Sequence, residues 1–373
     1  MKVALFTGNY NYLREGANRA LNTLVDYAER EAGAEVRAYS PVTDTPAFEP
    51  AGTLVPVPSV ALPGRSEFRL ALGLPRDVRA DLEAFAPDLV HIATPDILGT
   101  RAQSWALARG IPVAVSMHTD FASYMPYYRL GWLRPLVEAH LRRFYRRAGH
   151  VFAPTPALVE ELKAIRDDDK ASVWSRGIDR ELFSPAKRDM GWRRSLGIAD
   201  DEVAVLFFGR LVLEKGIALY AEAMSALAGQ RVRALVVGAG PAEDIVRAIP
   251  GAVLPGHLDG EALARAVASA DIMLTPSISE TFGQVVLESM ASGLPVISAD
   301  APSARALLVE GETGLLVPPS EVSAYIAAVE ALVSAAEKRR AMGEAARQAS
   351  AAYSWDAASQ SVVSVWQAIG ARV

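Results

Sequence analysis

Short hydrophobic runs rich in β-branched residues alternate with longer segments of helical periodicity along the whole chain. The runs lie at 2–8, 35–40, 88–93, 112–118 and 150–155 in the first half, and at 203–209, 233–238, 271–277 and 294–300 in the second. Helix-length segments such as 16–31 and 96–110 separate several of them. Continuous apolar strands between helices are typical of a parallel sheet that helices cover on both faces. The pattern therefore predicts an α/β fold.

The chain of 373 residues is long enough for two domains with separate cores. Its periodicity is interrupted between Ser175 and Leu196, where charged residues, glycine and proline are frequent. Such a stretch is typical of an interdomain connection, and a new strand begins soon after it. We therefore favour two doubly wound sheets over one large sheet, with a first domain at 1–175, a connection at 176–198 and a second domain from 199.

Composition excludes several classes of function. The formal net charge of −5 at pH 7 argues against nucleic acid as the main partner, because dedicated nucleic-acid binders are usually basic. The absence of cysteine excludes disulfides, thiolate metal sites and a cysteine nucleophile. The N-terminal apolar run is too short for a signal peptide, and no run of about 18 apolar residues exists to span a membrane. We expect a soluble cytoplasmic enzyme, for which contact with a membrane surface stays open.

Ligands of open α/β sheets bind beyond the carboxyl ends of the strands, so we expect the chemistry in the loops there. One strand ends at Gly209, and Arg210 and Lys215 follow it. Two cations in this position suit a diphosphate, because arginine binds phosphate oxygens bidentately and lysine acts as a point charge. The alternative is a solvated turn with basic residues.

The segment 277–298 follows another buried strand and carries a second candidate site. Thr281 can cap a helix that begins near Phe282. The amides of Phe282, Gly283 and Gln284 would then be unpaired first-turn donors, which form a ready anion site. Gly283 also has no side chain to hold a phosphate away from the backbone.

Two glutamates lie eight positions apart in the same apolar segment. Glu280 precedes the predicted helix, and Glu288 lies within it. Eight helical residues span about 12 Å, the scale of a nucleotide sugar. One carboxylate could therefore bind sugar hydroxyls and the other ribose hydroxyls. The alternatives are a charge favoured by the helix dipole for Glu280 and a solvent-facing helix residue for Glu288.

Taken in order, these motifs resemble retaining glycosyltransferases of family 4, which have the GT-B fold. The resemblance covers most of the chain and rests on an E-x7-E arrangement around Phe-Gly, "GRLVLEKG", "ESMASGLPVIS", "GIDRELFSP", "VEGETGLLVPP" and "YSWDAASQSVVSVWQ". It implies two Rossmann-like domains that face each other across a cleft. The second, at 199–356, binds a nucleotide-sugar donor, and the first binds the acceptor. The last helix, at 357–373, returns to the first domain.

The resemblance also implies a role for each residue of the donor site. Arg210 and Lys215 hold the donor diphosphate, Glu280 contacts the transferred sugar, and Glu288 binds the donor ribose. The amides of residues 282–284 meet sugar or phosphate oxygens.

Two further donor contacts come from the same resemblance. Gly16 occupies the place of a glycine-rich loop that approaches the donor phosphates, although this chain has "GAN" where many relatives carry Gly-Gly. The backbone near His257 and Leu258 faces the nucleobase.

His118 falls just after a buried strand. A lone histidine is more often structural, but the resemblance places this one against the donor sugar near the anomeric carbon. The expected catalytic group is His118, Glu280, Arg210 and Lys215. The "HTDF" sequence and the tyrosines after it resemble bacterial lipid-directed or mannose-transferring members. Asp120, Tyr124 and Tyr127 are therefore candidates for binding the acceptor, with a polar loop and aromatic packing as the alternative.

The segment 127–149 is basic and amphipathic. Its apolar positions recur at helical spacing and are Leu133, Leu136, Val137, His140, Leu141 and Phe144. Four arginines cluster toward its end, at 142, 143, 146 and 147. Such a helix can lie on anionic lipid. A core-facing helix with a solvated basic face explains the pattern equally well.

Two other signals are discounted. Gly238 and Gly240 follow a strand, but Glu243 stands where the third glycine of a dinucleotide fingerprint belongs. The acidic triplet 167–169 lies between a helix and the start of a strand, at the wrong end of the sheet, and reads as a solvated turn. The resemblance implies that no metal is needed for catalysis.

The sequence thus predicts a retaining, metal-independent hexosyltransferase with no cofactor beyond its donor, which is GDP-mannose or a UDP-hexose. The expected acceptor is a membrane lipid or glycolipid, reached by peripheral contact from the cytoplasm. One alternative is a sugar-nucleotide epimerase, which needs no acceptor. Others are an NAD-dependent oxidoreductase, which the incomplete fingerprint argues against, and a non-catalytic sugar-nucleotide sensor.

Overall fold

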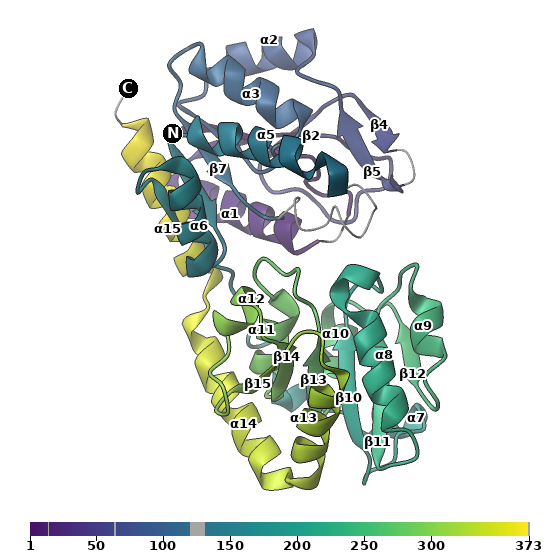
Figure 1. The fold of residues 1–373 in the computed structure, drawn as a ribbon. Helices are drawn as coiled ribbons and strands as arrows, with labels where there is room; N and C mark the ends of the chain where they lie inside the picture. Colours follow the sequence, from purple (N-terminus) through teal and green to yellow (C-terminus); the bar gives the residue numbers. More distant parts are fainter. Residues whose placement is uncertain (14, 63–64, 120–130, 372–373) are drawn as a thin grey trace. The chain divides into compact units, whose positions relative to one another are not determined.

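The computed structural model (Figure 1) describes residues 1–13, 15–62, 65–119 and 131–371. These residues form two compact units. Unit 1 contains the described residues up to Gly177 together with those from Trp355 onward, and unit 2 contains Ile178–Ser354. Within the described residues, the chain passes from unit 1 to unit 2 after Gly177 and returns after Ser354, and the expected connection at 176–198 belongs to unit 2 from Ile178.

The described part of unit 1 contains a parallel sheet with the strand order β3-β2-β1-β6-β7-β8-β9. Its strands are β1 (Lys2–Phe6), β2 (Glu35–Ser40), β3 (Thr53–Pro56), β6 (Leu89–Ile92), β7 (Val113–Ser116), β8 (His150–Ala153) and β9 (Ala171–Val173). An antiparallel pair, β4 (Ser59–Leu62) and β5 (Arg65–Ala71), forms a separate small sheet. The sequence pattern misses β3, β4, β5 and β9. β3, β4 and β9 are short or largely exposed and therefore carry little hydrophobic signal. β5 has charged residues at 65, 67 and 69, which interrupt its apolar run.

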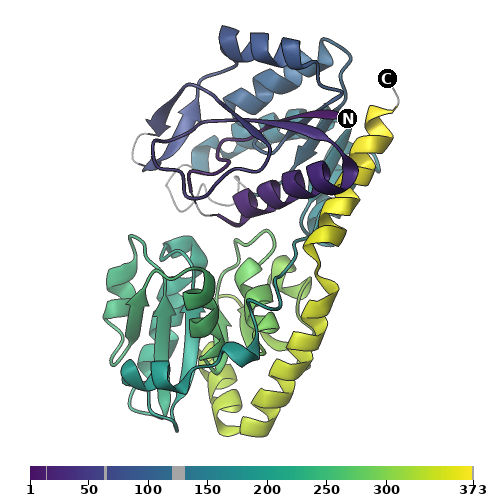
Figure 2. The ribbon, with the colours of Figure 1, turned by 180° about the vertical axis from the view of Figure 1, so that it is seen from behind.

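Helices cover both faces of this sheet. α1 (Gly16–Ala32) and α15 (Trp355–Gly370) pack against Val3 and Leu5 of β1, and Figure 2 shows α15 in yellow beside α1 in purple. α2 (Arg76–Phe85), α3 (Ile97–Leu107), α5 (Arg134–Arg146) and α6 (Pro156–Arg166) belong to the opposite core, which contains Ala4 and Phe6. Because alternate strand residues point to opposite faces, one apolar run supplies both cores.

The described part of unit 2, from Ile178 to Ser354, contains a parallel sheet with the order β12-β11-β10-β13-β14-β15. Its strands are β10 (Val203–Phe208), β11 (Val232–Val237), β12 (Val253–Gly256), β13 (Ile272–Thr275), β14 (Val296–Ala299) and β15 (Gly314–Val317). α8 (Ile217–Ala226), α9 (Glu243–Arg247) and α13 (Val322–Ser334) belong to one core, and α10 (Gly260–Ala268), α11 (Gln284–Ala291) and α12 (Pro302–Arg305) to the other. α14 (Ala336–Ala349) contributes to both.

The segment between Ile178 and Ile198 is packed irregular structure and not an exposed linker. Ile178 and Phe183 lie in the core of unit 2. The buried side chain of Arg193 donates to the carboxylate of Asp271 at 2.8 Å. The segment contains the short helices η3 (Pro185–Lys187) and α7 (Met190–Ser195). Its apolar and charged side chains therefore pack against the rest of unit 2.

The strand order reverses beside the first strand of each sheet. β1 lies between β2 and β6, and β10 lies between β11 and β13. This is the doubly wound Rossmann order, so the prediction of two Rossmann-like sheets is confirmed. Ligands of such sheets bind outside the carboxyl ends of the strands, at the point where the order reverses. The two positions to inspect are therefore β1/β6 and β10/β13.

Candidate functional site

The reversal point of unit 2 brings two predicted loops together. β10 and β13 are neighbouring parallel strands, so the loops 209–216 and 276–283 leave the same edge of the sheet. The hydroxyl of Ser279 donates to the carbonyl of Glu214 at 2.8 Å and ties one loop to the other.

Gly216 allows the close approach of these loops. Its φ is +73°, and a β-carbon at this position would lie 2.8 Å from the backbone of Pro276. Both the left-handed backbone and the contact require glycine. The turn thereby holds Lys215, at the end of the short helix η4 (Leu213–Lys215), against the loop after β13.

Lys215 and Glu280 form an ion pair in this position. Nζ of Lys215 lies 2.6 Å from Oε1 of Glu280, and the two side chains are 18% and 22% exposed. Arg210 lies in the same loop as Lys215, directly after β10, and is exposed. Three of the four residues expected in the catalytic group thus lie on two adjoining loops.

The helix after Glu280 begins later than the sequence predicts. α11 starts at Gln284, and its N-cap is Gly283 in the left-handed conformation, with φ +97° and no side-chain cap. The prediction that Thr281 caps a helix beginning near Phe282 is therefore wrong. The side chain of Phe282 is buried against Tyr353, with the rings edge to face, so the chain turns once more before the helix can begin.

The backbone amides around this turn are still candidates for binding an anion. Among the described residues, the N–H groups of Phe282 and Gly283 donate no hydrogen bond. Gln284 is the first helical residue, so its amide belongs to the first turn, where the helix has no carbonyl to offer. The ring of Phe282 lies in the core, so only its backbone could take part in such a contact.

Glu288 is buried within α11, so the solvent-facing alternative is wrong. Leu258 is half-buried in the loop after β12, with His257 exposed beside it. This loop leaves the same edge of the sheet as the loop of Lys215. Gly16 lies in unit 1 as the first residue of α1, and a β-carbon there would meet nothing within 4 Å.

The reversal point of unit 1 contains a carboxylate that the sequence reasoning missed. Asp96 caps α3 by accepting a hydrogen bond from the amide of Gly99 at 2.7 Å. Burial raises the pKa of Asp96 to about 6, against the opposing effect of its backbone hydrogen bonds. Its position directly after a buried strand, in "ATPD", is the signal that could have identified it.

His118 is held by two hydrogen bonds in unit 1. Its Nε2 lies 2.8 Å from the hydroxyl of Ser116, and its Nδ1 lies 2.9 Å from Nη2 of Arg176. Burial lowers the pKa of His118 well below its usual value, and the charge of Arg176 lowers it further. Arg176 is a second residue that the sequence reasoning missed, since it lies in a stretch without periodicity.

The acceptor candidates Asp120, Tyr124 and Tyr127 lie outside the described residues, as does the start of the basic segment 127–149. The described part of that segment forms η2 (Gly131–Leu133) and α5. Within α5 only Phe144 and Tyr145 are buried. The apolar positions recognised in the sequence are therefore only partly used for packing.

The acidic triplet is a structural turn. Asp167 ends α6 in the left-handed conformation, with φ +61°. Asp168 pairs with the buried guanidinium of Arg166 at 2.8 Å, and this hydrogen bond is the main cause of its lowered pKa. In the described part of the chain, no group of three or more histidine or acidic side chains is arranged to hold a metal ion.

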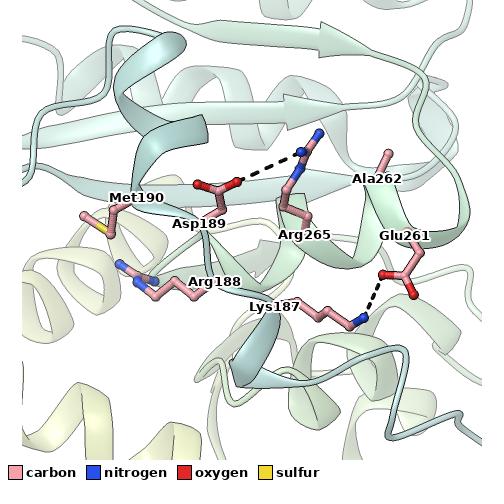
Figure 3. Close-up of a pocket in the computed structure, with 7 residues that line it drawn as sticks. All are labelled: Lys187, Arg188, Asp189, Met190, Glu261, Ala262 and Arg265. Carbon is pink, nitrogen blue, oxygen red and sulfur yellow. Dashed lines mark hydrogen bonds and ion pairs between the residues drawn. The ribbon is translucent and has the colours of Figure 1, made fainter.

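A cavity of about 670 Å³ lies elsewhere in unit 2, between the start of α7 and α10 (Figure 3). Two ion pairs lie along it, Lys187 with Glu261 at 2.8 Å and Arg265 with Asp189 at 4.0 Å, and Arg188 pairs with Asp271 at 2.7 Å. None of the predicted site residues lines it, so it is not the candidate site.

Two family models match the chain. "Glycosyltransferase Family 4" matches residues 14–182, and "Glycosyl transferases group 1" matches residues 190–349. A GDP-mannose-dependent alpha-mannosyltransferase of Mycolicibacterium smegmatis is 33% identical over 384 residues, covering 100% of this chain and 98% of that protein. A sulfoquinovosyl transferase of Arabidopsis thaliana is 30% identical over 372 residues, covering 97% of this chain and 72% of that protein.

Solved structures show the same fold at lower identity. Sucrose-phosphate synthase from Thermosynechococcus elongatus matches with a TM-score of 0.82 and 20% identity over 100% of both chains. Anabaena HepE in complex with UDP and glucose matches with a TM-score of 0.75 and 20% identity, over 98% of this chain and 99% of that one. Together with the full-length relatives, these matches show that the chain belongs to glycosyltransferase family 4 and has the GT-B fold.

Proposed function

We propose that this glycosyltransferase moves a hexosyl unit from a nucleoside-diphosphate sugar to a membrane lipid or glycolipid, with retention of configuration and without a metal ion. The observation that carries the proposal is the Lys215–Glu280 ion pair at the β10/β13 edge of unit 2. A cation for phosphate and a carboxylate for sugar hydroxyls lie together there, at the position where doubly wound sheets bind ligands.

The charges of this edge suit the cleavage of a sugar–diphosphate bond. Positive charge builds on the sugar and negative charge on the leaving diphosphate as the bond breaks. Arg210, Lys215 and the amides of Phe282 and Gly283 stabilise the diphosphate electrostatically. The acceptor attacks from the side of the leaving group, and a phosphate oxygen takes its proton, which gives retention without a protein nucleophile.

GDP-mannose is the first donor to test, with UDP-hexoses as the alternative. Three relatives that are 32–33% identical to this chain are named GDP-mannose-dependent alpha-mannosyltransferases. HepE, a more distant structural neighbour, has been solved with UDP-glucose. Calorimetry with matched GDP-, UDP- and ADP-sugars separates these donors, and failure of all of them to bind would contradict the donor assignment.

A lipid acceptor is supported by the exposed surface of α5 and of η2, which precedes it. Trp132 and Leu136 are 74% and 68% exposed, and Arg142 and Arg143 are exposed on the same short segment. Aromatic and aliphatic side chains beside arginines suit a surface that rests on anionic lipid. No helix in the described part of the chain is long and apolar enough to cross a bilayer.

Sedimentation with phosphatidylglycerol–phosphatidylcholine vesicles tests this surface. The variants are Trp132→Ala with Leu136→Ala, and Arg142→Glu with Arg143→Glu, each of which should weaken sedimentation of the full chain. Val309→Ala is the control, because Val309 is also an exposed aliphatic residue, at 54%, but lies in unit 2. Wild-type protein that stays in the supernatant would contradict a membrane acceptor.

One assay tests both the stereochemistry of transfer and the alternative activity as an epimerase. Proton NMR of the first product formed should show the anomeric configuration of the donor, and added EDTA should leave the rate unchanged. An inverted product, or loss of activity with EDTA, would contradict the corresponding part of the proposal. Conversion of the donor sugar without any acceptor would favour an epimerase instead.

A further inference from the structure

A continuous chain of hydrogen bonds runs through the interior of unit 1. Nε1 of Trp366 donates to Nδ1 of His91 at 2.9 Å, and Nε2 of His91 lies 2.8 Å from the hydroxyl of Ser116. The same hydroxyl lies 2.8 Å from Nε2 of His118, whose Nδ1 lies 2.9 Å from Arg176. These hydrogen bonds thus link α15, the last helix of the protein, to the loop after β7.

The two ends of this chain determine the protonation of both imidazoles. An indole N–H and a guanidinium can only donate hydrogen bonds. Nδ1 of His91 and Nδ1 of His118 must therefore both accept, so neither carries a hydrogen. In a neutral imidazole the hydrogen then lies on Nε2, and both Nε2–H groups donate to the hydroxyl oxygen of Ser116, which has two lone pairs to accept them.

Arg176 is an unusual cation. Its side chain is 5% exposed, and among the described residues no carboxylate pairs with it. Its guanidinium also donates to the carbonyls of Trp174 and Ser175, at 2.9 and 3.2 Å. A buried charge without a counter-ion is costly. We therefore expect the hydrogen-bond donors of Arg176 to have a role that a neutral side chain could not fill.

We propose that Arg176 and Trp366 are positioning residues that hold His118 in one orientation as the uncharged Nε2–H tautomer. This inference rests on the proposed function and on the place of His118 against the donor sugar, which the resemblance to family 4 implies. Both ring nitrogens are occupied within the protein, so His118 acts as a fixed neutral surface and not as a general base. An uncharged ring also adds no positive charge beside a sugar that becomes positive in the transition state.

The electrostatics of the site agree with this geometry. Burial lowers the pKa of His91 to about 3. The pKa of His118 is lowered first by burial, then by the charge of Arg176 and then by His91. Both shifts favour the uncharged ring, in agreement with the hydrogen-bond donor that faces Nδ1 of each histidine.

The test is 15N NMR of the full chain labelled at histidine. The chain has five histidines, and His118→Gln and His91→Gln assign two of them. Wild type should show both rings with a hydrogen on Nε2 and none on Nδ1 between about pH 5 and 8. A hydrogen on Nδ1 of His118, or a charged ring within this range, would overturn the proposal without any use of substrate.

Arg176→Met and Arg176→Lys provide the second arm. The methionine variant should lose the single-tautomer pattern of His118 and reduce kcat by roughly 10- to 100-fold, with little change in KM. The lysine variant keeps a cationic donor and should recover most of the pattern and the rate. Arg166→Met is the matched control, because Arg166 is equally buried in unit 1, at 6%, but contacts no histidine in the chain of hydrogen bonds.

The outcomes separate this inference from the proposed function. Unchanged spectra and kcat in Arg176→Met would overturn the positioning role, as would the same loss in Arg166→Met. The spectra could behave as expected while wild type transfers no sugar from any nucleoside-diphosphate sugar. In that case the hydrogen-bond chain stands, but the proposed function fails, and the catalytic role of the hydrogen-bond chain fails with it.

Discussion

Nζ of Lys215 lies 2.6 Å from Oε1 of Glu280, although the two residues are 65 positions apart in the sequence. The cation proposed for the donor diphosphate is therefore neutralised by the carboxylate proposed for the donor sugar. A complete donor offers a partner to each of them, with phosphate for Lys215 and hydroxyls for Glu280. A nucleoside diphosphate without the sugar must compete with Glu280 for Lys215.

Glu280→Gln should therefore bind the free nucleoside diphosphate more tightly while losing transfer. A partly exposed ion pair contributes about 1 kcal/mol or less, which corresponds to a gain of at most roughly fivefold in affinity. Calorimetry with GDP and UDP measures this gain. Glu261→Gln is the control, since it removes a carboxylate from Lys187 at the cavity away from the site. Weaker binding of the diphosphate by Glu280→Gln would show that the ion pair does not compete with it.

Arg210→Ala and Lys215→Ala should each lower kcat by about 100- to 1,000-fold, the usual effect of removing one group that stabilises developing negative charge. Neither side chain lies in a core, so thermal unfolding and circular dichroism should match the wild type. Lys187→Ala is the control for the loss of a basic residue from unit 2. Unchanged turnover in both site variants would refute the donor assignment.

Gly16→Ala should reduce activity without reducing stability. A β-carbon at Gly16 would meet nothing within 4 Å, and its φ is not in the left-handed region. The free energy of unfolding should therefore stay the same or rise by up to about 1 kcal/mol, because alanine loses less backbone entropy on folding.

The matched control is Gly33→Ala, at the other end of α1. Gly33 also has open space around it, but its φ is +59°, so alanine there should destabilise the protein by roughly 1 kcal/mol and leave turnover unchanged. Chemical denaturation and steady-state kinetics distinguish the two variants. Equal activity in Gly16→Ala and wild type would show that no ligand approaches this glycine closely.

Asp96 predicts a pH dependence of stability in unit 1. Its pKa is raised from 3.8 to about 6 by burial, so the folded state holds this proton at pH values where the unfolded state has lost it. The contribution of Asp96 to stability therefore falls as the pH rises through this window. Asp96→Asn keeps the oxygen that caps α3 but cannot ionise.

The difference in unfolding free energy between Asp96→Asn and wild type should accordingly grow in favour of the variant from about pH 4 to pH 7. The pKa shift sets an upper limit of about 3 kcal/mol, and solvent around the partly exposed carboxylate reduces it to roughly 1–2 kcal/mol. Urea denaturation at a series of pH values measures the difference. A constant difference would show that Asp96 is not desolvated in the folded protein.

Local residue chemistry identified the strand ends and the charged residues beyond them. Arg210, Lys215 and Glu280 were predicted because they follow continuous apolar runs, and such runs end at the edge of a parallel sheet. The start of α11 could not be predicted in the same way. Thr281 is a good cap by type, but the packing of Phe282 against Tyr353 and the left-handed Gly283 displace the helix start to Gln284.

Arg176 shows a second limit. It is defined by contacts with residues that are distant in the sequence. Arg176 reaches His118 across 58 positions, and Trp366 reaches His91 across 275. Periodicity reports only which face of an element is apolar, so it cannot show that a buried guanidinium completes a hydrogen-bond chain.

By itself, then, the sequence predicted two α/β units, the family and the loops of the candidate donor site, because apolar periodicity and short motifs are local properties of the chain. Only the tertiary structure decided which loops meet. The strand order that places β10 beside β13, and thus Lys215 beside Glu280, follows from how crossover helices pack on the sheet. That packing depends on all the elements of the unit together, so it cannot be predicted from any single segment of the sequence.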